Sequence, residues 1–98
     1  MAENEKKPAE GKYITYQGKP LVREGETICY GDLQDKYFLI LDIIGYKTEN
    51  GQKIPDNIIV QIVESANPSN ILKQATKQGL TAAMELGMVW LDRANKDS

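Results

Sequence analysis

The sequence predicts an α+β domain, in which an antiparallel sheet of about four strands in meander order carries one long C-terminal helix on one face. Two observations lead to this fold. The dipeptide Asn50-Gly51 stands between two long strand-like runs, residues 36–47 and 53–64, and favours a tight type I′ hairpin turn. The residues after Asn67-Pro68 place apolar side chains at helical spacing. Short connections favour the meander over a crossed topology, and a small curled barrel that holds the helix is the alternative.

The turn at Asn50-Gly51 fixes the register of the central hairpin. If Glu49 faces Gln52, one side of the hairpin is wholly apolar and pairs Ile43 with Ile58, Leu41 with Val60 and Leu39 with Ile62. The other side is mixed, with Ile44 opposite Asn57, Asp42 opposite Ile59, Ile40 opposite Gln61 and Phe38 opposite Val63. A slip of one residue would scatter both patterns. We therefore expect this register, with the apolar side in the core.

The segments before the hairpin are shorter. Residues 12–16 alternate as a strand does, and residues 17–20 then form a turn. Residues 21–23 and 27–30 flank Glu24-Gly25-Glu26, where the glycine can serve either a turn or a bulge within one bent strand. We favour the bent strand. Residues 1–11 are polar and predict a disordered tail, which leaves a single domain over 12–94 and a frayed end at 95–98.

The helix is predicted to begin at Asn67-Pro68, because an amide suits the N-cap and proline suits the first helical position. Ser69 or Asn70 could cap it instead. On a wheel of about 100° per residue, one broad stripe is expected to face the sheet. This stripe contains Ile71, Leu72, Ala75, Gly79, Ala82, Ala83, Leu86, Val89 and Trp90. The small residues at its centre would let the helix backbone approach the strands closely.

A second apolar group lies beside that stripe and consists of Leu80, Met84, Met88 and Leu91. A helix on a single sheet has no evident use for it, and contiguous apolar surface rich in methionine is typical of an interface. We therefore predict an interface, for which a symmetric homodimer is the simplest use. The alternative is that the early strands wrap around and cover these side chains.

The mixed side of the hairpin gives a second candidate site. Asn57 and Gln61 lie diagonally from Asp42 across the predicted ladder and could hold a polar ligand together with it. The alternative is that they simply form the hydrated outer face of an antiparallel sheet. Cys29 is flanked by Ile28 and Tyr30 and is interpreted as a small apolar side chain rather than a nucleophile.

Composition narrows the classes of function. The chain has 98 residues, a formal net charge of −2 and scattered lysines and arginines, which disfavours nucleic-acid binding. With one cysteine and no histidine, it lacks an intrachain disulfide, a thiolate zinc cluster and the commonest catalytic base, so we predict no catalytic residue, metal or cofactor.

No segment resembles a signal peptide or a membrane span, so the cytoplasm is the expected location. We predict a non-enzymatic protein that associates with itself through the second apolar group or a strand edge; a small-molecule binding module is the alternative.

Overall fold

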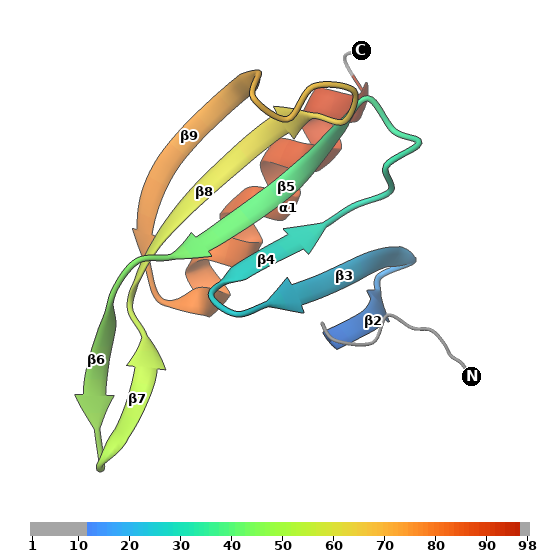
Figure 1. The fold of residues 1–98 in the computed structure, drawn as a ribbon. Coiled ribbons are helices and arrows are strands. Elements are labelled where there is room, and N and C mark those ends of the chain that lie inside the picture. Colours follow the sequence, from blue (N-terminus) through green and yellow to red (C-terminus); the bar gives the residue numbers. More distant parts are fainter. Residues whose placement is uncertain (1–11, 97–98) are drawn as a thin grey trace.

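The computed structural model of the chain describes residues 12–96, so the expected disordered tail over 1–11 and the last two residues lie outside the described part. The fold is α+β, as predicted. Six antiparallel strands form one sheet in the order β2-β3-β4-β5-β8-β9, β6 and β7 form a separate ribbon, and α1 lies on one face of the sheet (Figure 1). The elements are β2 (Lys12–Tyr16), β3 (Lys19–Glu24), β4 (Thr27–Tyr30), β5 (Tyr37–Ile43), β6 (Tyr46–Glu49), β7 (Gln52–Pro55), β8 (Asn57–Glu64), β9 (Ile71–Gln78) and α1 (Leu80–Lys96). The meander order is confirmed, but the sheet has more strands than the four expected.

The register set by Asn50-Gly51 is confirmed along the whole hairpin. Both residues have positive φ, 52° and 78°, and Glu49 pairs with Gln52. The same offset continues from the β6–β7 ribbon into the β5–β8 ladder, where Ile43 pairs with Ile58 and Phe38 with Val63. Residues 44–45 lie between the two ladders, where the chain bends and the ribbon projects from the main sheet (Figure 1). One turn therefore aligns both ladders.

The segment Glu24-Gly25-Glu26 is a turn, so the bent strand that we favoured is wrong. Glu24 pairs directly with Thr27, and Gly25 has φ of 60°. A glycine with positive φ at the first of two central positions is typical of a tight hairpin turn of type II′. The turn splits the expected bent strand into β3 and β4.

The core lies between the helix and the apolar side of the central hairpin, as expected. Six hairpin side chains there are at most 2% exposed: Leu39, Leu41, Ile43, Ile58, Val60 and Ile62. Ile28 and Tyr30 of β4 extend this layer, and Ala83 and Leu91 of α1 cover it. Each of the large aliphatic side chains contributes roughly 1.5–3 kcal/mol by burial, before the entropy of ordering is subtracted.

The predicted helix start at Asn67-Pro68 is wrong, because residues 71–78 form strand β9. The Asn70 amide donates to the Asn67 carbonyl, so this segment is the turn of a β8–β9 hairpin. Gly79, with φ of 90°, then ends the strand, and its carbonyl accepts the first helical hydrogen bond from Ala83. As an edge strand, β9 is polar on both faces and lacks the alternation of a half-buried strand. Its few apolar residues happen to have helical spacing.

The orientation of the helix also differs from the prediction. The residues that pack on the sheet are Leu80, Ala83, Met84, Gly87, Met88, Trp90, Leu91 and Ala94. Ala83 and Trp90 of the expected stripe are therefore confirmed on the sheet side, whereas Val89 is 57% exposed. The second apolar group was therefore wrongly placed outside the core. The expected stripe depended on residues 71–79, which are not helical.

The close approach of the helix occurs at Gly87 rather than at Gly79, because a Cβ on Gly87 would lie 2.6 Å from Leu39 Cδ1.

The C-terminal end of α1 is tied to the sheet. Asn95, which was expected to fray, is helical and clamps the backbone of Tyr37 at the start of β5. The Tyr37 amide donates to Asn95 Oδ1 at 3.0 Å, and Asn95 Nδ2 donates to the Tyr37 carbonyl at 3.2 Å.

Candidate functional site

The helix covers only part of the sheet. It packs mainly on β5, β8 and β9, and in Figure 1 it passes behind β5 and β8 while β2 and β3 extend beyond it. The strand register places Ile14, Tyr16 and Leu21 on the same face as the helix. Ile14 is 54% exposed and Tyr16 is 40% exposed. An apolar strip of this face is therefore left uncovered.

This strip and the nearest flank of the helix form a surface that we call the α1–β2 groove, defined by Ile14, Tyr16, Lys19, Met88, Val89 and Asp92. A cavity of about 350 Å³ lies within it, lined by Lys19 and Tyr30 from the sheet and by Met88, Val89 and Leu91 from the helix. Two of the four predicted interface residues, Met88 and Leu91, thus line the cavity. The other two, Leu80 and Met84, pack against the core.

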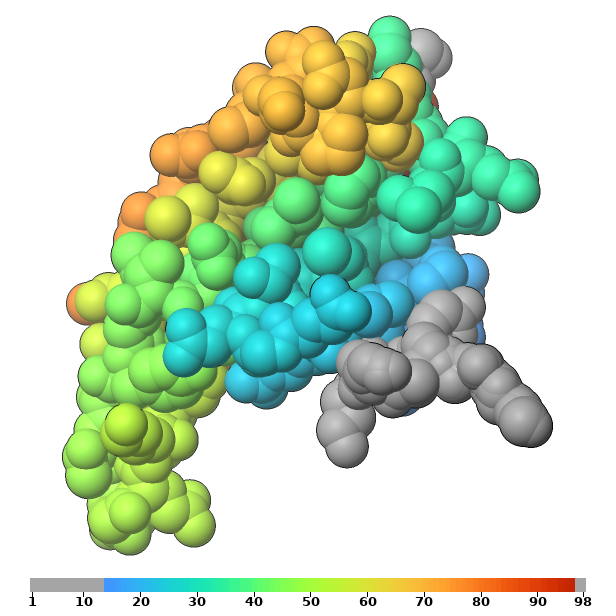
Figure 2. Space-filling model, viewed as in Figure 1, coloured from blue at the N-terminus to red at the C-terminus, as the bar shows by residue number. Residues whose placement is uncertain are grey.

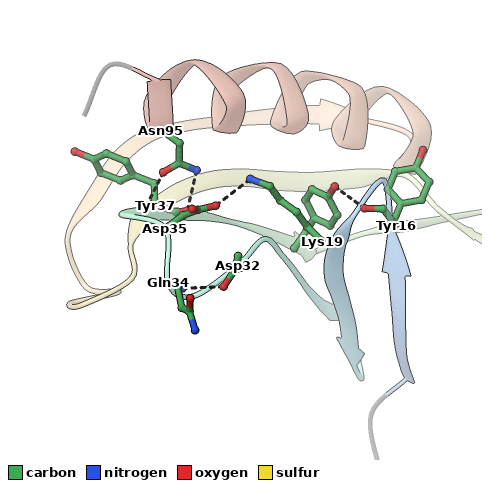
Figure 3. A network of polar contacts seen from close by, with 8 residues as sticks. Tyr16, Lys19, Asp32, Gln34, Asp35, Tyr37 and Asn95 are labelled. Carbon is green, nitrogen blue, oxygen red and sulfur yellow. Dashed lines mark hydrogen bonds and ion pairs between the residues drawn. The ribbon is translucent and has the colours of Figure 1, made fainter.

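Polar contacts order the sheet side of the groove (Figure 3). The Tyr30 hydroxyl donates to the Tyr16 carbonyl at 2.7 Å, and the two rings meet edge to face with centroids 5.9 Å apart. Burial raises the pKa of the Tyr30 hydroxyl, which keeps it a donor. Lys19 Nζ lies 3.0 Å from Asp35 Oδ2, which joins β3 to the connector before β5. The Tyr30 contacts thus tie the edge strand β2 to β4.

The rim of the groove has opposite charges on its two sides. Glu85 and Asp92 are exposed on the methionine flank of α1, whereas Lys19 and Arg23 occupy the helix-side face of β3. Three of these four charged residues already have partners within the chain. Asp92 pairs with Lys96 at 3.3 Å, Lys19 with Asp35 at 3.0 Å, and Arg23 Nε donates to the Gly25 carbonyl at 3.1 Å. Exposed polar pairs of this kind contribute little to stability, so a charged group can leave its partner in the chain for one on another molecule at little cost in free energy.

The predicted ligand residues lie on the opposite face of the sheet, which Figure 2 shows, and they do not converge. Thr27 Oγ1 donates to Asp42 Oδ1 at 3.3 Å, on the β4 side. Gln61 Nε2 donates to Gln74 Oε1 at 2.8 Å, on the β9 side. Asn57 is exposed at the start of β8, beside the bend at Gly45. The side chains share one face, as expected, but two of them are engaged by different neighbouring strands.

That face also contains an apolar hollow of about 510 Å³ that the sequence did not reveal. It is lined by Pro20, Val22, Cys29, Leu33 and Phe38, among others, and the connector 31–34 forms part of its wall. Burial raises the pKa of the Cys29 thiol, and the nearby Glu24 carboxylate raises it further. The thiol is therefore held neutral at pH 7 and has little nucleophilic character.

A third cavity, of about 300 Å³, lies at the other side of the helix, beside β9. Its lining includes Lys36, Tyr37, Leu72, Lys73, Trp90 and Arg93. Sequence reasoning missed this cluster because the predicted helix placed Lys73 and Trp90 in the same element, whereas the lysine belongs to a strand and reaches over the ring.

No protein-family model, curated protein or solved structure matches the chain. Within residues 12–96, no three histidine, cysteine, aspartate or glutamate side chains gather closely enough to bind a metal ion. Among the described residues, no helix is long and apolar enough to cross a membrane. What supports a function is therefore the geometry of the surfaces described above.

Proposed function

We propose that the protein is non-enzymatic and acts by association, with a second copy of itself docked in the α1–β2 groove. The observation that supports this is the uncovered strip of the helix-side face. Ile14 and Tyr16 stand exposed on β2, and the Tyr16 ring packs on Tyr30, which lines the cavity with Met88 and Val89. On the same face three strands further along the sheet, Leu39 and Leu41 are fully buried. Contiguous apolar surface that a domain leaves open is typical of an interface.

The chemistry of the rim favours a second copy as the partner. In a two-fold contact, the helix flank of one copy lies over β2 and β3 of the other, and the reverse contact forms at the same time. Glu85 and Asp92 of each copy then face Lys19 and Arg23 of the other. The acidic flank and the basic strand face are thus complementary within one sequence, so one surface serves both partners.

The remaining parts of the proposal rest on composition. The chain has no histidine, and the half-buried thiol of Cys29 is a poor nucleophile, which disfavours hydrolytic and acid–base catalysis. A net charge of −2 disfavours a nucleic-acid or anionic-membrane partner. We place the protein in the cytoplasm, where its one cysteine would remain reduced.

The experiment is sedimentation equilibrium over a range of concentrations on the wild type and two variants. Val89→Asp puts a charge into the groove at a site that is 57% exposed, so the fold is little affected. Ile44→Asp is the matched control, because Ile44 is 56% exposed at the bend before β6, outside the groove. We expect the wild type and Ile44→Asp to dimerise and Val89→Asp to remain monomeric. A wild type that stays monomeric at the highest concentration, or a Val89→Asp variant that dimerises normally, would contradict the proposal.

A further inference from the structure

The edge strand β9 has features of a binding surface that the proposed dimer does not use. Seven of its eight residues are exposed, and it pairs on one side only, with β8. The Gly79 amide donates to the Asp56 carbonyl, so the alternation of an antiparallel ladder turns the amides and carbonyls of Gln74, Thr76 and Gln78 outward. Outward backbone groups of this kind are a template for one more strand.

The helix-side row of β9 is basic. The register places Lys73, Ala75 and Lys77 on this row, opposite Ile62, Val60 and Ile58 of β8. Lys73 Nζ lies 5.3 Å from the centroid of the Trp90 ring, which holds the lysine over the helix. Lysines at both ends with a small side chain between them would suit a partner strand with acidic residues at matching positions.

The cavity at the N-terminal end of β9 extends this basic row. Lys36, Lys73 and Arg93 surround it together with the Tyr37 and Trp90 rings, and Lys36 Nζ is 5.6 Å from the centroid of Tyr37. In the described part of the chain, none of these three cations forms an ion pair with a carboxylate. The exposed helix acids Glu85 and Asp92 are on the opposite flank of α1. A chain with net negative charge thus concentrates unpaired cations at one edge of its sheet.

A second copy of β9 is a poor occupant of this edge. In an antiparallel pair centred on Ala75, Lys73 of one copy would face Lys77 of the other. In the registers centred on Gln74 or Thr76, lysines of the two copies would lie diagonally across the pair. Like charges therefore approach each other in all three registers, which disfavours self-pairing and leaves the edge to a partner of opposite charge.

We propose that the β9 edge binds an extended acidic peptide segment of another protein, which adds to the sheet as a seventh strand. The peptide backbone pairs with the outward groups of Gln74, Thr76 and Gln78. Acidic side chains four residues apart on the peptide lie opposite Lys73 and Lys77, and the one nearer the N-terminal end of β9 also reaches Arg93 and the cavity beside Trp90. Backbone pairing supplies affinity, and the lysines select the charge of the partner.

The probe is a synthetic peptide, acetylated and amidated, with the sequence Thr-Glu-Thr-Val-Thr-Glu-Thr. The control peptide has lysine in place of both glutamates. Trp90 is the only tryptophan in the chain, so its fluorescence reports directly on the cavity, and titration calorimetry measures the affinity independently. We expect saturable binding of the acidic peptide, weakened by added salt, and no binding of the basic peptide. Absence of acidic-peptide binding, or equal binding of both peptides, would overturn the proposal.

Charge reversal on the protein gives the matched test. Lys73→Glu combined with Lys77→Glu changes two exposed side chains, so the fold should be retained. We expect this variant to lose affinity for the acidic peptide by about tenfold or more, since two attractive cross-strand pairs become repulsive. It should gain affinity for the basic peptide. A variant that still prefers the acidic peptide would show that the lysines do not select the partner.

Strand addition itself is tested on the peptide rather than on the protein. N-methylation of alternate peptide amides blocks hydrogen bonding along one edge of the peptide while its charges are unchanged. Two peptides, one methylated on the odd amides and the other on the even amides, should differ in affinity for the protein, because only one edge of the peptide can face β9. Equal binding of both methylated peptides and the unmethylated one would reduce the contact to charge attraction and refute strand addition.

Discussion

The backbone of Gly87 in α1 lies directly against the side chain of Leu39 in β5. A Cβ at residue 87 would stand 2.6 Å from Leu39 Cδ1 and 2.7 Å from Leu39 Cδ2. Leu39 is fully buried within the core cluster, so it could make room only by displacing other core side chains. The distance between helix and sheet is therefore set by the missing side chain of one glycine.

We predict that Gly87→Ala destabilises the protein. Overpacking of a filled core costs about 1–3 kcal/mol, which outweighs the gain of about 1 kcal/mol in helix propensity over most of this range. Urea unfolding of the wild type, Gly87→Ala, Leu39→Ala and the double variant measures the effect. Leu39→Ala should cost less in the Gly87→Ala background than alone, because the added methyl group fills part of the cavity. Strict additivity of the two changes would contradict the contact.

Gly79→Ala tests the junction between β9 and α1. Gly79 has φ of 90°, and a Cβ there would meet nothing within 4 Å, so any cost is backbone strain rather than collision. We expect a loss of about 1–2 kcal/mol in the free energy of unfolding, and a smaller loss for Gly79→Asn. If a helix ran through residue 79, alanine would instead stabilise the protein by about 1 kcal/mol. The sign of the change in urea unfolding distinguishes the two structures.

Asn95→Ala removes the clamp between the end of α1 and the start of β5. The amide side chain makes two hydrogen bonds with the backbone of Tyr37, each of which contributes about 0.5–1.5 kcal/mol. We expect a loss of about 1–3 kcal/mol on thermal or urea unfolding. Lys96→Ala is the control, since it removes only an exposed i,i+4 pair with Asp92. Similar losses in both variants would argue against the clamp.

Stability should fall at alkaline pH. The pKa values of Cys29 and Tyr30 are raised in the folded state, chiefly by burial, so the folded protein holds these protons more tightly than the unfolded chain. The resulting contribution is fully present below the unfolded pKa values, about 8.5 for cysteine and about 10 for tyrosine, and is lost as the pH rises through the folded values. Unfolding measured at intervals above pH 7 should show this decline.

The variant Cys29→Ala separates the two groups. Without the thiol, the part of the decline that begins near the cysteine value should disappear, while the part due to Tyr30 remains. An unchanged pH profile in Cys29→Ala would show that the thiol titrates equally in the folded and unfolded states.

The central hairpin was predicted correctly from the sequence because two independent signals agreed there. The turn at Asn50-Gly51 requires positive φ at both residues, and the alternation of apolar side chains accepts a single register. The edge strand β9 offered neither signal. Its turn lacks a glycine, and as an edge strand it is polar on both faces, so only the spacing of Ile71, Leu72 and Ala75 remained, and this resembles a helix.

The error at β9 also affected the candidate sites. Once residues 71–79 were included in the helix, the sheet-facing stripe was chosen around them, and Leu80, Met84, Met88 and Leu91 were left outside the core. The strip of β2 and β3 beyond the helix could not be predicted, because it depends on how many strands the helix spans. The cluster of Lys73 and Trp90 likewise requires the strand and the helix to be separate elements.

The meander described above has a kinetic consequence. Each strand of the main sheet hydrogen-bonds to the strand that comes next in the chain, except where the β6–β7 ribbon intervenes between β5 and β8. Closing such short loops costs little entropy, so we expect the sheet to assemble outward from the central hairpin and α1 to dock last. Stopped-flow refolding should then be slowed by changes in Leu41 or Val60, whereas Gly87→Ala should mainly accelerate unfolding. If Gly87→Ala instead slowed refolding, and changes in Leu41 or Val60 mainly accelerated unfolding, the helix would belong to the folding nucleus.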